Sequence, residues 1–316
     1  MKQQPKVLLK FLGVSLEKGL PLSVDFAVLG GTMAALLGDE NSSAGILAEY
    51  AAGLKSPPAG KVVAGSGMAL STSREGRAAT GYISDSIDAP PGMTVKGCVN
   101  LAVTATGKKR AEASHDTAQL LKWLDLEKHG GVPVAKLDPP ELQRAAMAIA
   151  MATSPELLVV GCAVHDSLHS RLKGFAEAGN AVLFKAESLG QIPFGVERIA
   201  LCDENGISRT VRHSELAAVS LGGSEITVSF YPSLPRKQLE MLEGVKNLVH
   251  TDGAYRFTHA DTTFAITQLM HIARANSRAV VELHISPVPP GILLKMFEPP
   301  DVHKAQSGLF GVEEGF

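Results

Sequence analysis

The stretch ALLGDENSSAGILAEYAAGL, residues 35–54, decides the fold of the amino-terminal part of the chain. The apolar segment TMAALL, residues 32–37, leads into Gly38, a short polar loop follows, and a helical pattern occupies residues 43–53. The N-terminus of a helix that follows a tight loop offers free N–H groups to an anion. We therefore predict a strand–loop–helix unit with the outline of a phosphate-binding loop.

The loop lacks the side chains with which such a loop holds phosphate. A P-loop has the pattern G-x-x-x-x-G-K-[ST], whose lysine reaches the phosphates and whose hydroxyl binds Mg²⁺. The lysine position falls on Ala44 and the hydroxyl position on Gly45. Asp39 and Glu40 would take the amide donors of the loop and repel a triphosphate. The sequence thus favours a structural turn capped by its own acids over residual anion or nucleotide binding.

The composition is that of an ordinary globular protein. The chain has 316 residues, of which 45% are hydrophobic, and its net charge is -2; at roughly 150 residues per domain, two domains are expected. The sequence has no basic run, which argues against nucleic acid, and no apolar stretch near the ~18–20 residues that span a membrane. Three cysteines form no CxxC pair, so a reduced cytoplasmic location without direct membrane insertion is expected.

Strands alternate with helices up to about residue 215, which predicts an α/β sheet. We expect strands at 7–17, 21–29, 32–37, 81–84, 157–163, 181–184 and 198–207, a short strand pair at 61–70, and helices at 43–53, 94–106, 110–128, 139–153 and 166–178. Pro139 and Pro140 stand at the start of one helix, where a missing amide costs little.

A different order begins near residue 224. A strand at 225–231, a helix at 235–245, a hairpin at 247–259, a helix at 262–277 and a strand at 278–286 follow one another. This β-α-β-β-α-β order is that of the split ferredoxin-like unit. A short helix at 290–297 and a flexible tail at 299–316 are expected to follow it.

Five segments in order resemble the ATP-binding subunit of an ABC transporter, over about residues 6–215. Residues 36–54 have the length of a Walker A segment, and SPPAGKVVAGSG, 56–67, resembles the stretch that follows it. Residues 81–102 resemble the Q-loop region, and residues 134–166 resemble the signature helix and the Walker B strand. AVLFKAESL, 181–189, resembles the switch-histidine strand.

The resemblance implies an ABC-type P-loop NTPase fold, of α/β class, with a small C-terminal α+β domain. The cassette domain would span residues 1–218, with a helical subdomain at about 86–154. The ferredoxin-like domain would span 219–298 and resembles the extension of subunits that drive small export permeases, including those linked to drug export and gliding motility.

The same alignment shows that every catalytic position departs from the family pattern. The degenerate P-loop comprises Gly38, Asp39, Glu40, Asn41, Ser42, Ser43, Ala44 and Gly45, and the degenerate signature comprises Leu137, Asp138, Pro139, Pro140 and Glu141. The Q-loop glutamine is replaced by Asp85, the Walker B acids by Gly161 and Cys162, and the switch histidine by Glu187. We therefore expect no catalytic residue, no bound cofactor and no metal.

These losses bear on partners as well as on chemistry. Phosphoryl transfer depends on charge neutralisation around the γ-phosphate, and one lost donor can lower the rate by about 10²–10³-fold. In this family each ATP lies between the P-loop of one subunit and the signature of the other. Because Pro139 and Pro140 donate no amide, pairing with an active subunit would leave both sites defective, which favours a homodimer or a scaffold role.

The sequence therefore predicts an inactive structural or regulatory subunit, peripheral at the inner face of the membrane through a partner. A membrane permease, or an export or motility complex, would dock in the groove between the Q-loop and the helical subdomain, at about 85–115. The alternative is a weak ATPase subunit that binds phosphate through a non-standard set of residues. Only under this alternative would the chain bind ATP and Mg²⁺.

Two smaller hypotheses concern the same region. Cys162, His165 and His169 form C-x₂-H-x₃-H, and two histidines at i, i+4 of a helix would share a face toward zinc; no fourth ligand is identified. Asp85 and Glu187 could form an acidic pair beside the cleft, although solvated carboxylates are the favoured interpretation.

Overall fold

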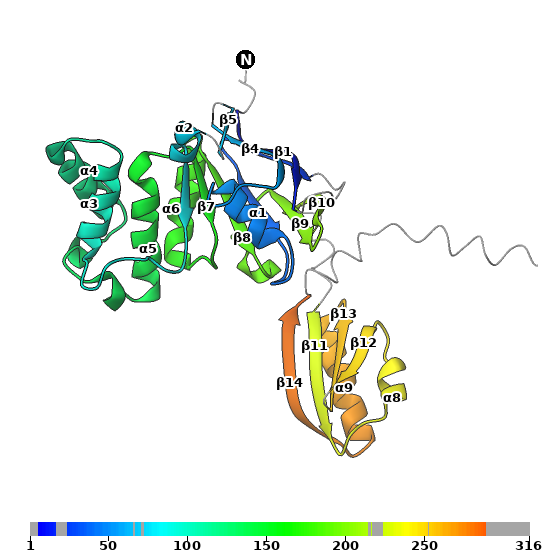
Figure 1. Cartoon of the computed structure of the whole chain (residues 1–316). Helices are drawn as coiled ribbons and strands as arrows, with labels where there is room; N and C mark the ends of the chain where they lie inside the picture. Colours follow the sequence, from blue (N-terminus) through cyan, green and yellow to red (C-terminus); the bar gives the residue numbers. More distant parts are fainter. Residues whose placement is uncertain are drawn as a thin grey trace, which may run out of the picture.

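A six-stranded sheet forms the centre of the amino-terminal unit (Figure 1). The computed structural model describes residues 6–16, 24–65, 67–70, 73–213, 216, 224–251 and 253–288. The strand order is β10-β9-β3-β8-β7-β6. The strands are β3 (Met33–Leu37), β6 (Thr80–Ile83), β7 (Leu157–Val160), β8 (Ala181–Ala186), β9 (Arg198–Asp203) and β10 (Gly206–Arg212). All are parallel except β10, which is antiparallel to β9.

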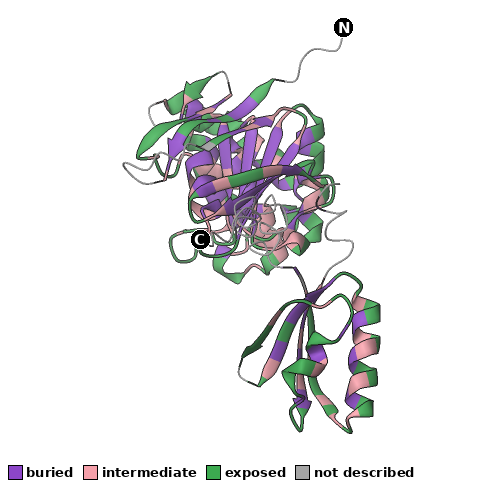
Figure 2. Cartoon of the chain, turned by 90° about the vertical axis from the view of Figure 1, so that its right-hand side faces the viewer, coloured by how far each residue is buried: buried purple, intermediate pink, exposed green. Residues whose placement is uncertain are grey.

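Both faces of this sheet are covered, which explains the unbroken apolar runs of its strands (Figure 2). Every residue of β3 is buried. Its neighbouring side chains point to opposite faces: Leu36 packs in one hydrophobic cluster and Leu37 in the other. The cluster around Leu37 includes buried side chains from four long helices: α3 (Val95–Ala105), α4 (Arg110–Trp123), α5 (Pro139–Ala150) and α6 (Asp166–Glu177).

The cluster around Leu36 joins the sheet to α1 and to a second, antiparallel sheet. Helix α1 spans Ala44–Ala51, and the second sheet has the order β2-β1-β4-β5. Its strands are β1 (Val7–Ser15), β2 (Val24–Leu29), β4 (Ala59–Ala64) and β5 (Met68–Ala69), and α2 (Arg74–Ala78) leads from it to β6. The predicted hairpin of the first two strands and the predicted strand pair near residue 65 are confirmed.

Two predicted helices end earlier than the apolar pattern indicated. Helix α4 ends at Trp123 because Asp125 has a φ of 55°, which no right-handed helix accommodates. Leu124 and Leu126 are buried nevertheless, from the turn that follows the helix. Short 3₁₀ segments cover the remaining ends and connections: η1 (Glu127–His129), η2 (Val134–Lys136), η3 (Met151–Thr153) and η4 (Leu189–Gln191).

The predicted strand at 198–207 is in fact the first half of a hairpin. Strand β9 ends at Asp203, whose Oδ1 accepts the N–H groups of Asn205, at 2.7 Å, and Gly206, at 3.0 Å. This aspartate turn reverses the chain into β10, which the sequence analysis did not predict as a strand.

The carboxy-terminal unit has the predicted order and the ferredoxin-like topology. Its elements are β11 (Ser224–Tyr231), α8 (Arg236–Glu240), β12 (Lys246–Thr251), β13 (Ala254–His259), α9 (Thr262–Ala275) and β14 (Ala279–Pro287). The four strands form an antiparallel sheet of order β12-β13-β11-β14. Helix α8 is shorter than predicted, and the predicted helix at 290–297, the tail and Asp252 of the hairpin turn lie outside the described residues.

No helix in the described part of the chain is long and apolar enough to cross a membrane.

Candidate functional site

Four of the positions singled out from the sequence meet at one edge of the central sheet. Gly38 follows β3, Asp85 follows β6, Gly161 follows β7 and Glu187 follows β8. These strands are parallel, so their carboxyl ends lie at the same edge. Ligands of open α/β sheets bind at this edge, and the fold therefore assembles the outline of a nucleotide site.

Four consecutive backbone N–H groups of the loop after β3, those of residues 41–44, donate to other groups of the protein. The Asn41 N–H donates to Asp39 Oδ1 at 3.1 Å, and the Ser42 N–H donates to the Asp39 carbonyl at 3.1 Å. The Ser43 N–H donates to the carbonyl of Asp203 at 2.7 Å, and the Ala44 N–H to Ser42 Oγ at 3.3 Å. A phosphate would have to displace these acceptors, because an anion binds in such a loop through free N–H groups.

The turn is held by Asp39 and Ser42 together, whereas the sequence predicted the acids alone. Ser42 Oγ donates to the Asp39 carbonyl at 2.7 Å while it accepts the Ala44 amide. Ser43 Oγ donates to the carbonyl of Gly206 at 3.0 Å, and Ser43 is buried. Both loop hydroxyls are thus directed to protein acceptors.

Gly38 and Ala44 are fixed by packing. A Cβ at position 38 would meet the Ser42 side chain and lie 2.9 Å from the carbonyl oxygen of Cys202. Ala44 is fully buried at the start of α1. A lysine at this position would therefore have to leave the protein interior or carry its charge into it, which is costly.

Tyr82 occupies the space beside the first Walker B position. A Cβ on Gly161 would overlap the hydroxyl and ring of Tyr82. Burial raises the pKa of the Tyr82 hydroxyl, with smaller contributions from Cys162, Glu49 and Asp85. The tyrosine side chain therefore fills the space that any side chain at position 161 would need.

Cys162, which the sequence analysis assigned to a Walker B acid position, is a neutral thiol at neutral pH. Burial, assisted by Asp85, raises the pKa of this thiol to about 11. The side chain of Gln143, on α5, holds the segment after β7: its Nε2 donates to the Ala163 carbonyl at 2.6 Å, and its Oε1 accepts the His165 N–H at 2.9 Å. The sequence analysis missed Gln143, which no motif spacing marks.

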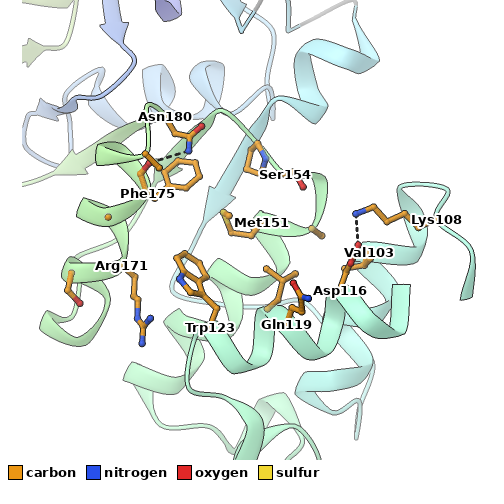
Figure 3. A pocket seen from close by; sticks show the side chains of 16 residues that line it. Val103, Lys108, Asp116, Gln119, Trp123, Met151, Ser154, Arg171, Phe175 and Asn180 are labelled. Atoms are coloured by element: carbon orange, nitrogen blue, oxygen red, sulfur yellow. Dashed lines mark hydrogen bonds and ion pairs between the residues drawn. The ribbon is translucent and has the colours of Figure 1, made fainter. Parts of the chain in front are cut away.

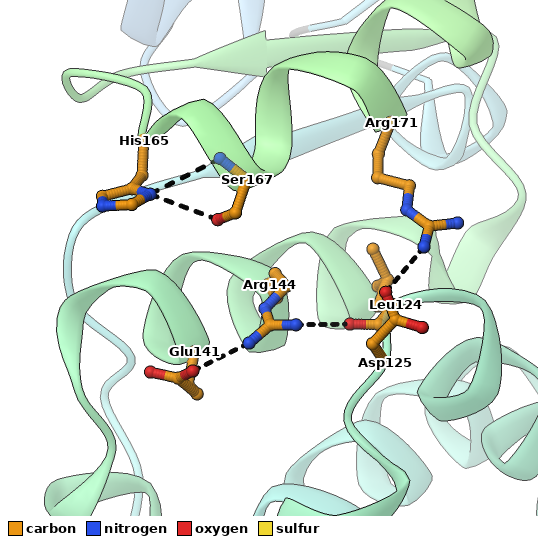
Figure 4. Close-up of polar contacts among 7 residues, drawn as sticks. All are labelled: Leu124, Asp125, Glu141, Arg144, His165, Ser167 and Arg171. Atoms are coloured by element: carbon orange, nitrogen blue, oxygen red, sulfur yellow. Dashed lines mark hydrogen bonds and ion pairs between the residues drawn. The ribbon is translucent and has the colours of Figure 1, made fainter.

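The signature stretch forms a plain helix start. Helix α5 begins with Pro139 and Pro140, neither of which carries an N–H group. The carboxylate of Glu141 binds the Arg144 guanidinium at 2.8 Å, and Arg144 also donates to the Leu124 carbonyl at 3.4 Å (Figure 4). The first turn of α5 therefore lacks two backbone N–H groups.

The zinc hypothesis is wrong. Helix α6 begins at Asp166, so His165 is its N-cap residue and shares no helical face with His169. His165 Nδ1 contacts Ser167 Oγ at 3.2 Å (Figure 4), and His169 Nε2 contacts the Phe194 carbonyl at 2.7 Å. Within the described ranges, no group of three or more histidine, cysteine, aspartate or glutamate residues could hold a metal ion.

Glu187, which the sequence analysis assigned to the switch position, pairs with Lys185 of β8, the strand that it follows. Its Oε1 lies 2.5 Å from Lys185 Nζ, and its N–H donates to Gln191 Oε1 at 2.8 Å. The structure thus gives Glu187 a cationic partner. The negative charge of Asp85 instead contributes to the raised pKa values of Tyr82 and Cys162.

A groove lies between the segment after β6 and the helices α3 and α5. Its volume is about 350 Å³ and its walls are mainly apolar. Leu101, on α3, is 58% exposed beside it. The groove falls within the stretch that the sequence analysis assigned to permease docking.

A second cavity, of about 1040 Å³, lies away from the loop (Figure 3). Ser154 and Asn180 line it and precede β7 and β8, so it opens at the opposite edge of the sheet. The guanidinium of Arg171 lies over the Trp123 ring at 5.9 Å and binds Asp125 at 2.7 Å. The positive charge of Arg171 is therefore already paired with the carboxylate of Asp125.

Solved structures of ABC proteins share this architecture. The ATP-binding subunit of an ABC transporter superposes with a TM-score of 0.57 at 19% identity, covering 67% of this chain and 92% of that one. The chain has the fold of an ABC transporter ATP-binding subunit. The protein cbiO1 of Clostridium perfringens, part of the ABC transporter complex cbiONQ, gives 0.58 at 16% identity, covering 67% and 91%. The dimeric cassette MJ0796, bound to ADP and Pi, gives 0.54 at 18% identity, covering 65% and 98%.

Sequence comparison agrees with the ABC-type fold over a shorter range. The chain is 28% identical over 140 residues to the methionine import ATP-binding protein MetN of Caulobacter vibrioides. That match covers 43% of this chain and 42% of MetN, so it spans less than half of the relative. No family model matches the chain.

Proposed function

We propose that this ABC-type chain is a non-hydrolysing structural or regulatory subunit that docks on a membrane permease, or on an export or motility complex, from the cytoplasmic side. The observation that carries the proposal is the occupied loop after β3. Asp39, Ser42 and Asp203 accept four consecutive N–H groups of this loop, those of residues 41–44. Nucleotide binding would require these internal bonds to break.

Two further features support the proposed absence of ATP hydrolysis. Tyr82 fills the space beside Gly161, and the thiol of Cys162 stays protonated because its pKa is raised to about 11. A general base must be able to accept a proton near the working pH. Neither group can therefore replace the magnesium ligand or the base of an ATPase.

The docking role rests on the groove between the segment after β6 and α3. Its walls include Ile87, Met93 and Leu101, which suit the apolar face of a helix from a membrane partner. One solved relative is part of an ABC transporter complex and another is a dimer. We propose the same two kinds of contact for this chain: a permease, and a second copy to which the carboxy-terminal unit contributes.

The test is complementation of a strain that lacks the chain, together with membrane fractionation. Ser42→Ala, Ser43→Ala and Cys162→Ala should preserve both function and membrane association. Loss of function by a stable, membrane-associated variant of this set would mean that the cleft still has a ligand, which is the result the weak-ATPase alternative requires.

A further inference from the structure

Strand β14 forms an outer edge of the carboxy-terminal sheet (Figure 1). It is nine residues long, and β11 is its one partner strand among the described residues. Edge strands that avoid association usually carry lysine or an internal proline, or are covered. β14 contains no lysine and its proline is its last residue, whereas β12, at the other edge, begins with Lys246.

The side chains along β14 suit contact with another strand. Val281 is 67% exposed and Ile285 is 42% exposed. Glu282 and His284, an acid and a base two residues apart, are also exposed. An edge that offers unpaired backbone groups, apolar side chains and both kinds of charged side chain can add a strand.

We propose that β14 pairs antiparallel with β14 of a second copy, on a two-fold axis at Leu283. An axis perpendicular to the sheet keeps the helices of both copies on one side and places residues of the same face opposite one another. Centring at Glu282 would oppose two carboxylates, and centring at His284 would oppose two imidazoles. Centring at Leu283 places Glu282 opposite His284 twice, and at both places an imidazole N–H can donate to the carboxylate across the strand pair.

The register of β14 limits the extent of this pairing. Residues Glu282 to Ile285 pair regularly with β11, and the register shifts at Val281. Such a bulge bends the strand, so pairing covers about five residues of each copy, with Val281 opposite Ile285 at both ends. The surface buried by a contact of about five residues is small compared with the ~800 Å² per partner of a standard stable interface. The dimer is therefore weak and depends on concentration.

This inference deepens the self-association proposed above and is independent of the docking groove. Sedimentation equilibrium of the full chain over a concentration series measures it. His284→Glu opposes Glu282 with a second acid at two places and should raise the dimer dissociation constant about tenfold. The double variant Glu282→Lys, His284→Glu recreates opposite charges and should return the constant to the parent value.

A control and a register test accompany the charge swap. Thr251→Glu adds an acid to the other edge strand, β12, and should leave the dimer unchanged. A mixture of Glu282→Cys and His284→Cys proteins should form an intermolecular disulfide faster than either protein alone, because only the mixture places two cysteines directly opposite. The predicted order of disulfide rates holds only for the axis at Leu283.

A monomeric parent at every concentration would overturn the proposal. So would a His284→Glu protein that dimerises like the parent, a double variant that stays as weak as the single variant, or equal cross-linking in mixed and unmixed samples. None of these results alters membrane association through the groove, which is measured separately by fractionation.

Discussion

At the scale of single residues, the contact of Tyr82 with Gly161 determines whether position 161 can carry a carboxylate side chain. We predict that Gly161→Asp lowers the free energy of unfolding by about 1–3 kcal/mol, because overpacking a filled space costs that much. The new Cβ would overlap the Tyr82 hydroxyl and ring. Urea unfolding measures the change.

Gly131→Asp is the matched control, since a Cβ at Gly131 meets nothing within 4 Å. It should leave stability within about 0.5 kcal/mol of the parent, as is usual for open surface sites. In Tyr82→Ala protein the additional cost of Gly161→Asp should become smaller. Equal costs with and without the tyrosine ring would contradict the overlap.

Cys162 gives a residue-scale prediction for pH. Burial raises the pKa of its thiol from 9.0 to about 11, so the unfolded chain loses this proton at a lower pH than the folded chain does. The contribution of Cys162 to stability is constant below about pH 9, and the free energy of unfolding then falls as pH rises toward about 11. Urea unfolding at about pH 8 and about pH 10.5 should show a larger fall for the parent than for Cys162→Ser. Parallel falls would show that another group is responsible.

At the scale of elements, the sequence predicted most strands because their signals are local. Unbroken apolar runs such as residues 32–37 indicate strands buried on both faces, and the β-α-β-β-α-β order needs only the element sequence. The end of α4 at Trp123 was missed because apolar periodicity says nothing of one left-handed residue, Asp125. The turn at residues 203–206 was predicted from its DENG sequence and is confirmed, whereas strand β10 beyond it was missed because more than half of its residues are polar or charged. Contacts between segments that are distant in the sequence, such as Gln143 with Ala163 and Tyr82 with Gly161, also cannot be predicted from the spacing of residues along the chain.

The groove beside α3 yields the element-scale prediction. We expect Leu101→Glu to reduce the fraction of the chain that sediments with membranes by about tenfold or more, because a buried unpaired charge at an interface costs several kcal/mol. Leu54→Glu is the control: Leu54 has the same exposed fraction as Leu101, 58%, and follows α1. Quantitative fractionation of both variants measures the effect. Equal membrane association of the two variants would place the docking surface elsewhere.

At the scale of the whole molecule, the chain has an ABC-type fold, and the proposed loss of nucleotide binding concerns only residues at one edge of its central sheet. The central sheet still brings the ends of β3, β6, β7 and β8 together, and the apolar clusters on its two faces do not depend on a bound ligand. The fold can therefore persist as a scaffold after nucleotide chemistry is lost, because packing stabilises the fold and the edge residues supply the chemistry.

Calorimetric titration of the full chain with Mg-ATP tests the central claim most directly. Four loop amides, those of residues 41–44, donate to Asp39, Ser42 and Asp203, and the sequence analysis assigned the lysine position to Ala44. We therefore predict no saturable heat up to millimolar Mg-ATP. A saturable isotherm with a dissociation constant of about 1–10 μM, equivalent to roughly 7–8 kcal/mol of binding free energy, would contradict the account.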